Sequence, residues 1–150
     1  LLGELDSINR TAISRKTIHE LNDNGLINYL GKTDNVLEQL TNADCVVLPS
    51  YREGSPRSLM EASSMALPII ATNVVGCRQV IDDGITGLLC REKDSSDLAV
   101  KMELMLKMSM SDRKKMGRLG RKKMVEEFDE SIVISRYLDT IKNILSKRYL

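Results

Sequence analysis

Two glutamates, Glu53 and Glu61, lie eight positions apart in the segment LPSYREGSPRSLMEA, residues 48–62. An apolar run leads there into a Gly-Ser-Pro turn, which is typical of a buried strand that ends and a helix that begins. Acidic side chains are not needed to close a hydrophobic core at such a junction. A ligand bound at the mouth of the turn would explain both carboxylates.

The helix after this turn is predicted to begin with Ser55 as its N-cap and Pro56 in its first position, and to run to about Ala66. The next backbone amides, those of Arg57, Ser58 and Leu59, would then have no partner inside the helix. Together with the helix dipole, these amides form an anion site that suits a phosphate group.

Gly54 and the carboxylates complete the predicted site. Gly54 allows a ligand to approach the backbone closely. Glu61 falls in the second helical turn and its side chain tilts toward the N-terminus, so it can face the same mouth as Glu53. Carboxylates accept hydrogen bonds from sugar hydroxyls, and Arg57 adds positive charge beside a diphosphate. A nucleotide-sugar meets all of these demands.

Spacing alone also fits a purely structural role. A glutamate on an exposed helical turn is usually solvated, and Arg57 can form a surface ion pair with Glu53 or Glu61. Both interpretations stay open when only the spacing is considered.

Composition excludes several functional classes. The chain has 150 residues, of which 42% are hydrophobic and 29% charged, as in an ordinary globular domain. A net charge of +1, with four Tyr, one Phe and no Trp, does not favour nucleic acid as a partner. No apolar run approaches the roughly 20 residues that a membrane span requires, and no signal-peptide pattern is present.

The cysteines are odd in number and none lies close to another: Cys45, Cys77 and Cys90 each occupy or adjoin an apolar run. They are predicted to be buried free thiols in a reducing compartment. His19 is the only histidine and is expected at the surface of a polar helix. Because no metal-ligand spacing exists, neither a metal nor any other cofactor is predicted.

Strand-like and helix-like segments alternate over the first part of the chain. Strands are expected at 1–5, 26–31, 45–50, 68–72 and 87–90, and helices within 11–25, 35–43, 55–66 and 77–84. The helix at 11–25 should stop at Asn24-Gly25, Thr33 or Asp34 should cap the next one, and Val74-Val75-Gly76 should form a turn. The strand at 45–50 is expected at the centre of the sheet, covered on both faces.

This alternation predicts the α/β class, with a Rossmann-like parallel sheet flanked by helices. Ligands of such sheets bind at the carboxyl ends of the strands, where residues 48–62 lie. Residues 94–150 are predicted to be a mainly helical tail, with helices starting at Ser95-Ser96-Asp97, Ser111-Asp112 and Ser131.

A basic segment lies within this tail and comprises Arg113, Lys114, Lys115, Arg118, Arg121, Lys122 and Lys123. A solvated helix face is the favoured interpretation, because acidic residues follow at 126, 127 and 129 and because Met116, Leu119 and Met124 supply a core face. Peripheral contact with anionic membrane lipid is the alternative.

Residues 48–89 resemble the donor-binding half of retaining GT-B glycosyltransferases of family 4, whose marker Glu-x7-Glu is met by Glu53 and Glu61. The segment EGSPRSLMEA is similar to bacterial transferases that build surface polysaccharides or lipid-linked oligosaccharides. The resemblance extends upstream through residues 26–50 and downstream to the first helix of the tail. It implies the C-terminal half of a GT-B fold.

The resemblance also implies roles for individual residues. Glu53 would contact the hydroxyls of the donor sugar, Glu61 the ribose, the amides near Arg57 the diphosphate, and the backbone near Gly31-Lys32 the base, usually uracil. Helix-end amides and Arg57 would stabilise charge on the leaving diphosphate. The expected catalytic residues are thus Glu53 and Arg57, and the expected donor-binding residues are Gly31, Lys32, Gly54, Ser55, Ser58, Leu59 and Glu61.

The family is metal-independent, and this sequence has no Asp-x-Asp at a strand end. It departs from the family at Ala66, where glycine is common. The family's basic residue after the first strand of this domain, and its acceptor-binding domain, are expected upstream of Leu1. Residues 1–150 are therefore expected to be one donor-binding domain of a longer cytoplasmic enzyme, working at the inner face of the membrane, and to transfer little alone. The glycan or lipid-linked acceptor would be bound by the missing domain.

Two rival functions are weighed. Nucleotide-sugar epimerases share the GT-B architecture, although they lack the EGSPRSLMEA pattern. A non-catalytic nucleotide-binding or interaction domain is the other rival, and the retention of both Glu53 and Glu61 is the feature that opposes it.

Overall fold

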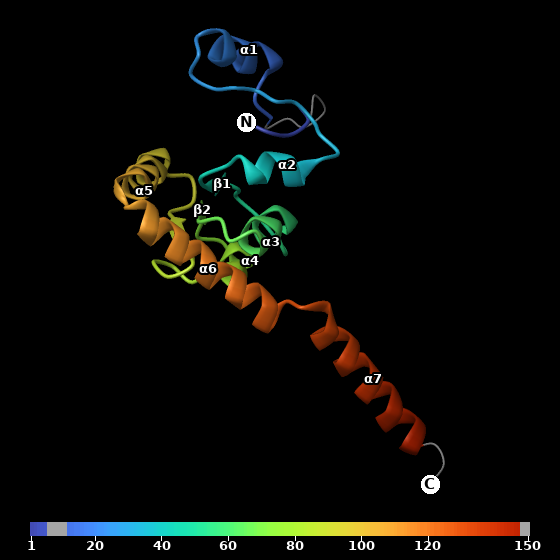
Figure 1. Cartoon of the computed structure of the whole chain (residues 1–150). Coiled ribbons are helices and arrows are strands. Elements are labelled where there is room, and N and C mark those ends of the chain that lie inside the picture. The colour runs from blue at the N-terminus through green and yellow to red at the C-terminus, as the bar shows by residue number, and fades with distance from the viewer. Residues whose placement is uncertain (6–11, 148–150) are drawn as a thin grey trace. The chain divides into compact units, whose positions relative to one another are not determined.

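The computed structural model describes residues 1–5 and 12–147 (Figure 1). Thr11, which falls in the first expected helix, lies outside the described residues. The chain divides into two compact units, Leu1–Gln39 and Leu40–Leu150, and each is described by itself. That residues 1–150 form one donor-binding domain stays a prediction.

The first unit contains helix α1, Arg15–Asp23. Ser14 is its N-cap, and the Ser14 hydroxyl oxygen accepts a hydrogen bond from the amide of Thr17 at 3.0 Å. The helix ends in a Schellman motif, in which Gly25 has a φ of +68° and the amide of Leu26 donates to the carbonyl of Leu21. The predicted stop at Asn24-Gly25 is confirmed, and His19 is exposed as expected.

The two strands predicted in this unit are wrong. Residues 1–5 and 26–31 meet only through a single bridge between Leu2 and Gly31. Most of their side chains are exposed or half-buried, so no packed face extends the pairing into a ladder.

Helix α2, Val36–Thr41, is the short helix expected at 35–43. Its first turn is capped by Asn35, whose side-chain oxygen accepts from the amide of Glu38 at 3.3 Å. Thr33 stabilises the turn before the helix, because its hydroxyl oxygen accepts a hydrogen bond from the amide of Asn35 at 3.1 Å. The prediction that Thr33 or Asp34 caps the helix is therefore wrong.

The second unit is built on a parallel three-stranded sheet in the order β1-β2-β3. The strands are β1, Val46–Leu48, β2, Ile69–Thr72, and β3, Gly87–Cys90. Among the described residues β1 pairs only with β2, so it is an edge strand, and the side chain of Val47 is 36% exposed. The central, doubly covered position predicted for residues 45–50 belongs to β2, which is wholly buried.

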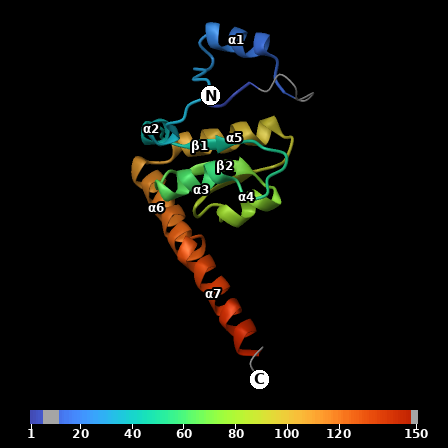
Figure 2. The ribbon, with the colours of Figure 1, turned by 90° about the vertical axis from the view of Figure 1, so that its right-hand side faces the viewer.

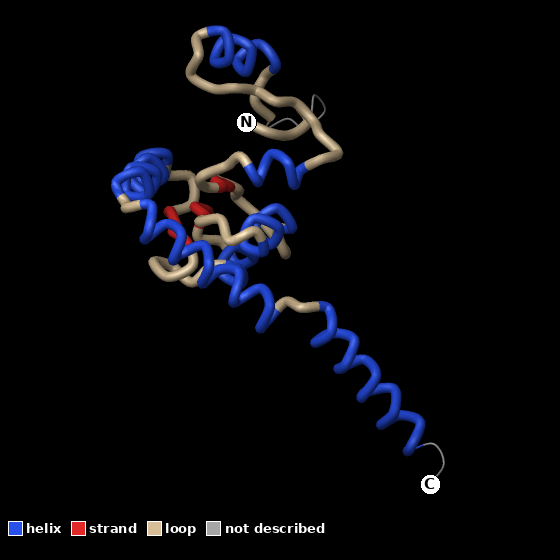
Figure 3. Tube along the Cα trace, viewed as in Figure 1, coloured by secondary structure: helices blue, strands red, loops and turns tan. Residues whose placement is uncertain are grey.

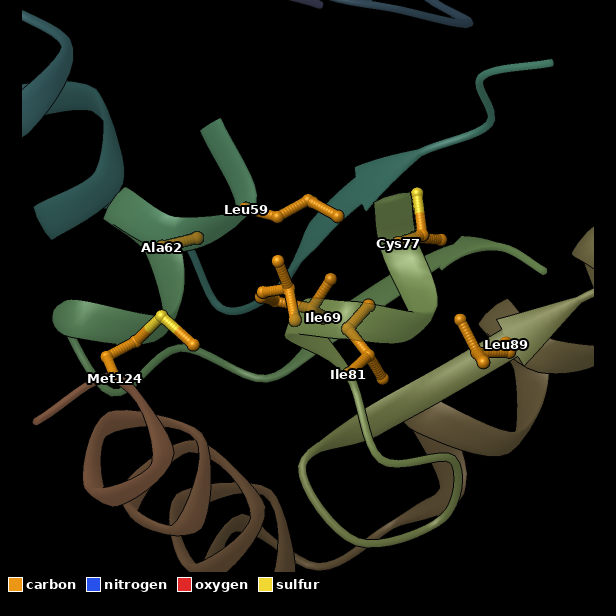
Figure 4. Packing of buried hydrophobic residues seen from close by; sticks show 9 residues of the cluster. Leu59, Ala62, Ile69, Cys77, Ile81, Leu89 and Met124 are labelled. Carbon is orange, nitrogen blue, oxygen red and sulfur yellow. The ribbon is translucent and has the colours of Figure 1, made fainter. Parts of the chain in front are cut away.

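Helices cover both faces of this sheet, which confirms the predicted α/β class (Figure 2). They are α3, Arg57–Ser64, α4, Val75–Val80, α5, Ser95–Lys107, and α6, Met110–Glu127. One core lies against α3 and α4 and includes Leu59, Ala62, Ile69, Cys77, Ile81, Leu89 and Met124 (Figure 4). The other lies under α5 and contains Ile70, Leu88, Met105 and Met116.

Helix α6 reaches both cores, because Met116 joins the layer of α5 and Met124 the layer of α3 and α4. It crosses the amino ends of the strands, where Gly117 lies against the backbone of Ala66 just before β2. Lys123 ties the same helix to the turn before β3 through an ion pair with Asp82 at 2.6 Å. The side chain of Lys123 is only 12% exposed.

The helices of the tail begin close to their predicted starts. Helix α5 begins at Ser95, as predicted, with Asp94 as its N-cap. Helix α6 begins at Met110, one residue before the predicted Ser111, with Ser109 as its N-cap. The last helix, α7, is Glu130–Lys147 (Figure 3). Its apolar residues have helical spacing as expected, yet those from Val133 to Leu145 are about half exposed or more.

Helix α3 ends in a Schellman motif at Ala66, which has a φ of +59°. The amide of Ala66 donates to the carbonyl of Ser63 at 2.9 Å, and the amide of Leu67 donates to that of Ala62 at 3.0 Å. The left-handed conformation costs an alanine free energy that a glycine at the same place would not lose. The departure from the family pattern therefore falls on a strained residue, and α6 packs directly on it.

Replacing Gly117 with alanine should destabilise the fold, because the new Cβ would lie 1.9 Å from the carbonyl oxygen of Ala66. We expect the free energy of unfolding in a denaturant titration to fall by about 2 kcal/mol, although alanine favours an isolated helix. Gly120→Ala is the matched control, because its Cβ would meet its nearest neighbour at 3.5 Å. Equal stability of the two variants would contradict the close approach at Gly117.

Replacing Ala66 with glycine should stabilise the fold by about 0.5 kcal/mol, because relief of the positive φ exceeds the extra entropy of the unfolded chain. Thermal unfolding followed by circular dichroism measures this change. Ala99→Gly, on the exposed face of α5, is the same substitution in ordinary helical geometry and should cost about 1 kcal/mol. A loss of stability in both variants would show that Ala66 is not strained.

Candidate functional site

Glu53 lies in the connection from β1 to α3, at the carboxyl edge of the sheet, and Glu61 lies in α3 itself. Helix α3 begins at Arg57, and Pro56 is its N-cap without a side-chain hydrogen bond. The predicted cap at Ser55 is thus wrong by one residue. The hydroxyl of Ser55 instead lies 3.7 Å from the sulfur of Met60, as a donor to it. Proline preorganises this cap through its fixed φ rather than through a hydrogen bond.

The shifted start also changes the amides that can meet an anion. The amide of Leu59 donates to the carbonyl of Pro56 at 3.1 Å, so the prediction that it is free is wrong. Arg57 and Ser58 precede the first hydrogen bonds of the helix, and both are exposed. Leu59 contributes in another way, since its wholly buried side chain anchors the start of α3 in the core.

Glu53 is half-buried, whereas Glu61 is exposed in the second turn of α3. Among the described residues neither carboxylate forms an ion pair, and neither does Arg57. The surface pair that the sequence left open is therefore not formed. Both acids and the guanidinium are available to a ligand.

Two glycines lie beside Glu53: Gly54 borders open space, and Gly76 allows close backbone packing. A Cβ added to Gly54 would meet nothing within 4 Å, so this glycine faces open space. A Cβ added to Gly76 would lie 2.4 Å from the carbonyl oxygen of Gly54 and 2.5 Å from that of Glu53. Gly76 is the second residue of α4, not part of the turn predicted at 74–76, and it lets α4 press on the backbone that carries Glu53.

A pocket of about 390 Å³ opens where the three strands end. Residues after β1, β2 and β3 all contribute to it, as expected for ligand sites in parallel sheets. Its lining consists of Tyr51, Arg52, Glu53, Asn73, Val74, Val75, Arg78 and Glu92. Of the predicted site residues only Glu53 lines this pocket, while Gly54, Ser55, Arg57, Ser58 and Glu61 belong to the adjoining loop and helix.

Two contacts hold the rim of this pocket. The Arg78 guanidinium donates to the backbone and side-chain oxygens of Asn73, at 3.1 Å and 2.9 Å. The ammonium of Lys93 lies 5.6 Å from the centre of the Tyr51 ring. The first contact fixes the loop after β2, and the second joins the loops after β1 and β3.

The pKa values of all three cysteines are raised. Burial raises the pKa of the Cys77 thiol, and the nearby carboxylate of Glu53 raises it further. Burial likewise raises the pKa of Cys90, and that of Cys45 to about 11. All three are free thiols, with Cys77 and Cys90 buried as predicted and Cys45 half-buried. A raised pKa keeps a thiol protonated at neutral pH, and the protonated form is the poorer nucleophile.

Gly31 and Lys32, the residues predicted near the base, belong to the first unit. Gly31 has a φ of +69°, and the ammonium of Lys32 forms an exposed ion pair with Glu4 at 3.3 Å. Their role as donor-binding residues stays a prediction.

Several residues of the pocket escaped the sequence analysis, notably Arg52, Asn73, Arg78 and Glu92. Arg52, Asn73 and Glu92 had one usable signal, because each falls within four residues after a strand end. Arg78 and Gly76 had none, because their contacts depend on how α4 packs. Within residues 1–5 and 12–147, no cluster of His, Cys, Asp and Glu could hold a metal ion, and no helix is long and apolar enough to span a membrane.

Comparison with known proteins identifies sequence relatives of this chain. An N-acetylgalactosaminyltransferase of Campylobacter jejuni, named for transfer to N,N'-diacetylbacillosaminyl-diphospho-undecaprenol, is 34% identical over 131 residues, which cover 83% of this chain and 34% of that protein. An N-acetyl-alpha-D-glucosaminyl L-malate synthase of Bacillus anthracis is 36% identical over 73% of this chain and 28% of that protein. The chain thus spans about a third of the length of these relatives.

Solved structures share the fold at lower identity. The sucrose-phosphate synthase of Thermosynechococcus elongatus superposes with a TM-score of 0.81 at 22% identity, over 98% of this chain and 38% of that one. The Anabaena protein HepE, solved in complex with UDP, gives a TM-score of 0.83 at 18% identity, over 95% of this chain and 40% of that one. Both are GT-B glycosyltransferases, and the likeness shows that the described fold is part of theirs.

Residues 9–123 match the family of glycosyl transferases group 1. Because this match takes in both glutamates, the pocket and most of the chain, the protein belongs to the glycosyl transferases group 1 family.

Proposed function

We propose that this chain is the donor-binding domain of a retaining glycosyltransferase that uses a UDP-sugar. The observation that carries the proposal is the position of Glu53 and Glu61 on either side of the start of α3, beside a pocket at the carboxyl edge of the sheet. Both carboxylates lack ion-pair partners among the described residues, so they are free to accept hydroxyl hydrogen bonds.

The proposed binding mode divides the donor among these groups. The amides of Arg57 and Ser58 and the Arg57 guanidinium hold the diphosphate, where an N-terminal helix dipole favours negative charge. Glu61 accepts from the ribose hydroxyls, and Glu53, at the pocket, from those of the sugar. The open space at Gly54 leaves room for the diphosphate between them.

The known proteins support a UDP-sugar in particular. HepE of Anabaena has been solved with UDP and with UDP-glucose. The name of the Campylobacter relative specifies an N-acetylhexosamine and a lipid-linked acceptor. We therefore propose a hexose or N-acetylhexosamine as the transferred sugar and a glycan or lipid-linked molecule as the acceptor. A second domain, outside residues 1–150, would bind that acceptor, so this chain alone should transfer little.

In the reaction itself, we propose that Arg57 and the two helix-end amides stabilise the charge that grows on the leaving diphosphate. Donors preorganised at this position need no rearrangement as the bond breaks. No metal is required in this scheme, and the cytoplasm, where nucleotide-sugars would be supplied, is the proposed location.

Binding of UDP should depend on Glu61. Titration of the ¹⁵N-labelled chain should give shifts around residues 53–61 with UDP, and smaller ones with GDP or ADP. Glu61→Ala should weaken UDP binding about tenfold or more, because a hydrogen bond to a charged group contributes about 1.5–3 kcal/mol. The matched control is Glu103→Ala, at an exposed helical glutamate of α5 that pairs with Lys107, and it should leave UDP binding unchanged.

If no nucleotide shifts the spectrum of the folded chain, the same titration is repeated on the full-length protein. Binding there would show that the isolated domain cannot bind the donor by itself. Absence of binding in both would favour a non-catalytic interaction domain.

Glu53 should distinguish UDP from UDP-sugars. Glu53→Gln should leave the dissociation constant of UDP within about twofold, but weaken binding of UDP-glucose or UDP-N-acetylgalactosamine about tenfold, since only the sugar meets Glu53 in the proposed mode. Isothermal titration with each ligand measures the difference. An equal loss for UDP and for UDP-sugars would place Glu53 at the nucleotide instead.

A further inference from the structure

The outer face of α6 is a row of cations. Its buried side, formed by Met116, Gly117, Gly120 and Met124, faces the core. On the opposite side lie the exposed cations Lys114, Lys115, Arg118, Arg121 and Lys122, which we call the α6 basic face, together with the exposed Ser111 and Val125. They fall at helical spacings of three and four, so they share one surface.

Neighbouring cations of the same segment have structural roles that these residues lack. The Arg113 guanidinium donates to the carbonyls of Met105 and Leu106 at the end of α5, at 3.4 Å and 3.5 Å. Lys123 pairs with Asp82 and Glu127. In residues 1–5 and 12–147, only Lys122 of the basic face has an acidic partner, Glu126 at 3.7 Å.

Of the acidic residues near the end of α6, Glu126 pairs with Lys122 of the basic face, whereas Glu127 and Asp129 have other partners. The exposed cations and the buried Met116 and Met124 agree with the solvated-face interpretation. Glu127 is turned to Lys123, and Asp129 accepts from the hydroxyl of Ser131. Arg118 lies four residues from both Lys114 and Lys122, and like charges at this spacing destabilise a helix. The surface keeps a repulsion that a bound polyanion would relieve.

A pocket with a mixed polar and apolar lining adjoins the basic face. It has a volume of about 320 Å³ and is lined by Gly84, Ile85, Met108, Asp112, Lys115, Met116 and Leu119. Lys115 belongs to both features, so one cation of the basic face lines the pocket. The side chain of Ile85 is 56% exposed beside it.

These features lie at the amino edge of the sheet. Gly117 contacts Ala66 before β2, and Gly120 approaches Thr86 before β3. The pocket beside Glu53 lies at the carboxyl edge. A partner on the basic face therefore leaves the mouth of that pocket open.

We propose that the α6 basic face docks on a membrane surface rich in anionic lipid. The cations meet the phosphates of the headgroups, and Ile85, with the apolar lining beside Lys115, enters the boundary with the acyl chains. A nucleic acid would also meet the cations, but it would gain little from the exposed Ile85 and finds no aromatic side chain on α6 to stack on.

The test is flotation of the 150-residue chain with vesicles of phosphatidylcholine alone or mixed with phosphatidylglycerol. Binding should require phosphatidylglycerol, and should be lost as salt rises from about 0.1 M to about 1 M and the screening length falls from about 10 Å to about 3 Å. The double variant Lys114→Gln/Arg118→Gln should bind the mixed vesicles about 25-fold less tightly, at about fivefold for each charge.

The matched control is Lys16→Gln/Lys107→Gln, which removes the same net charge from exposed helical lysines that have acidic partners. It should bind vesicles as the unchanged chain does. The basic-face variant should unfold at the same temperature or slightly higher, because like-charge pairs have been removed, so weaker binding cannot be ascribed to misfolding.

Three results would overturn the proposal: no binding to mixed vesicles, an equal loss in both double variants, or retention of a short RNA or polyphosphate in preference to vesicles. None of these depends on Glu53 or Glu61, so lipid docking and donor binding succeed or fail separately.

Discussion

The close contact between Gly117 of α6 and the carbonyl of Ala66 is the constraint on which the layers of this unit depend. It brings α6 across the amino ends of the strands, where Met116 reaches the core under α5 and Met124 the core under α3 and α4. One helix thereby closes both sides of a sheet that has only three strands among the described residues. A side chain at Gly117 would separate the layers, because a backbone carbonyl cannot move aside as a side chain can.

A second glycine contact has the same function at the opposite edge. Gly76 brings α4 against the peptides of Glu53 and Gly54, so the loop between β1 and α3 rests on packed backbone. Leu59 anchors the far end of that loop in the core. The proposed donor groups are thus held on elements with little freedom, which is what a site that binds a charged ligand by preorganised donors requires.

The sequence predicted the local features of this site well. An apolar strand, a Gly-Ser-Pro turn and an amphipathic helix placed Glu53 and Glu61 at a strand end, since each of these signals acts over a few residues. The wrong predictions concern the start of helix α3 and the strand expected at residues 26–31. Ser55 is a better N-cap by preference than Pro56, yet the helix starts after Pro56, and the side chain of Leu59 in its first turn is wholly buried. Residues 26–31 have strand composition, but within the described part of the chain they pair through one bridge alone.

The sequence by itself determined the α/β class, the family resemblance, the strands β1, β2 and β3, and the residues that carry the proposed chemistry. Only the tertiary structure decided that β1 is an edge strand, that Gly76 supports the backbone of Glu53, and that Arg78 and Asn73 line the pocket. It also decided which cations of α6 have partners and which face solvent. Propensity and spacing act between neighbours in the chain, whereas these features arise from contacts between segments whose distance in space no local pattern records.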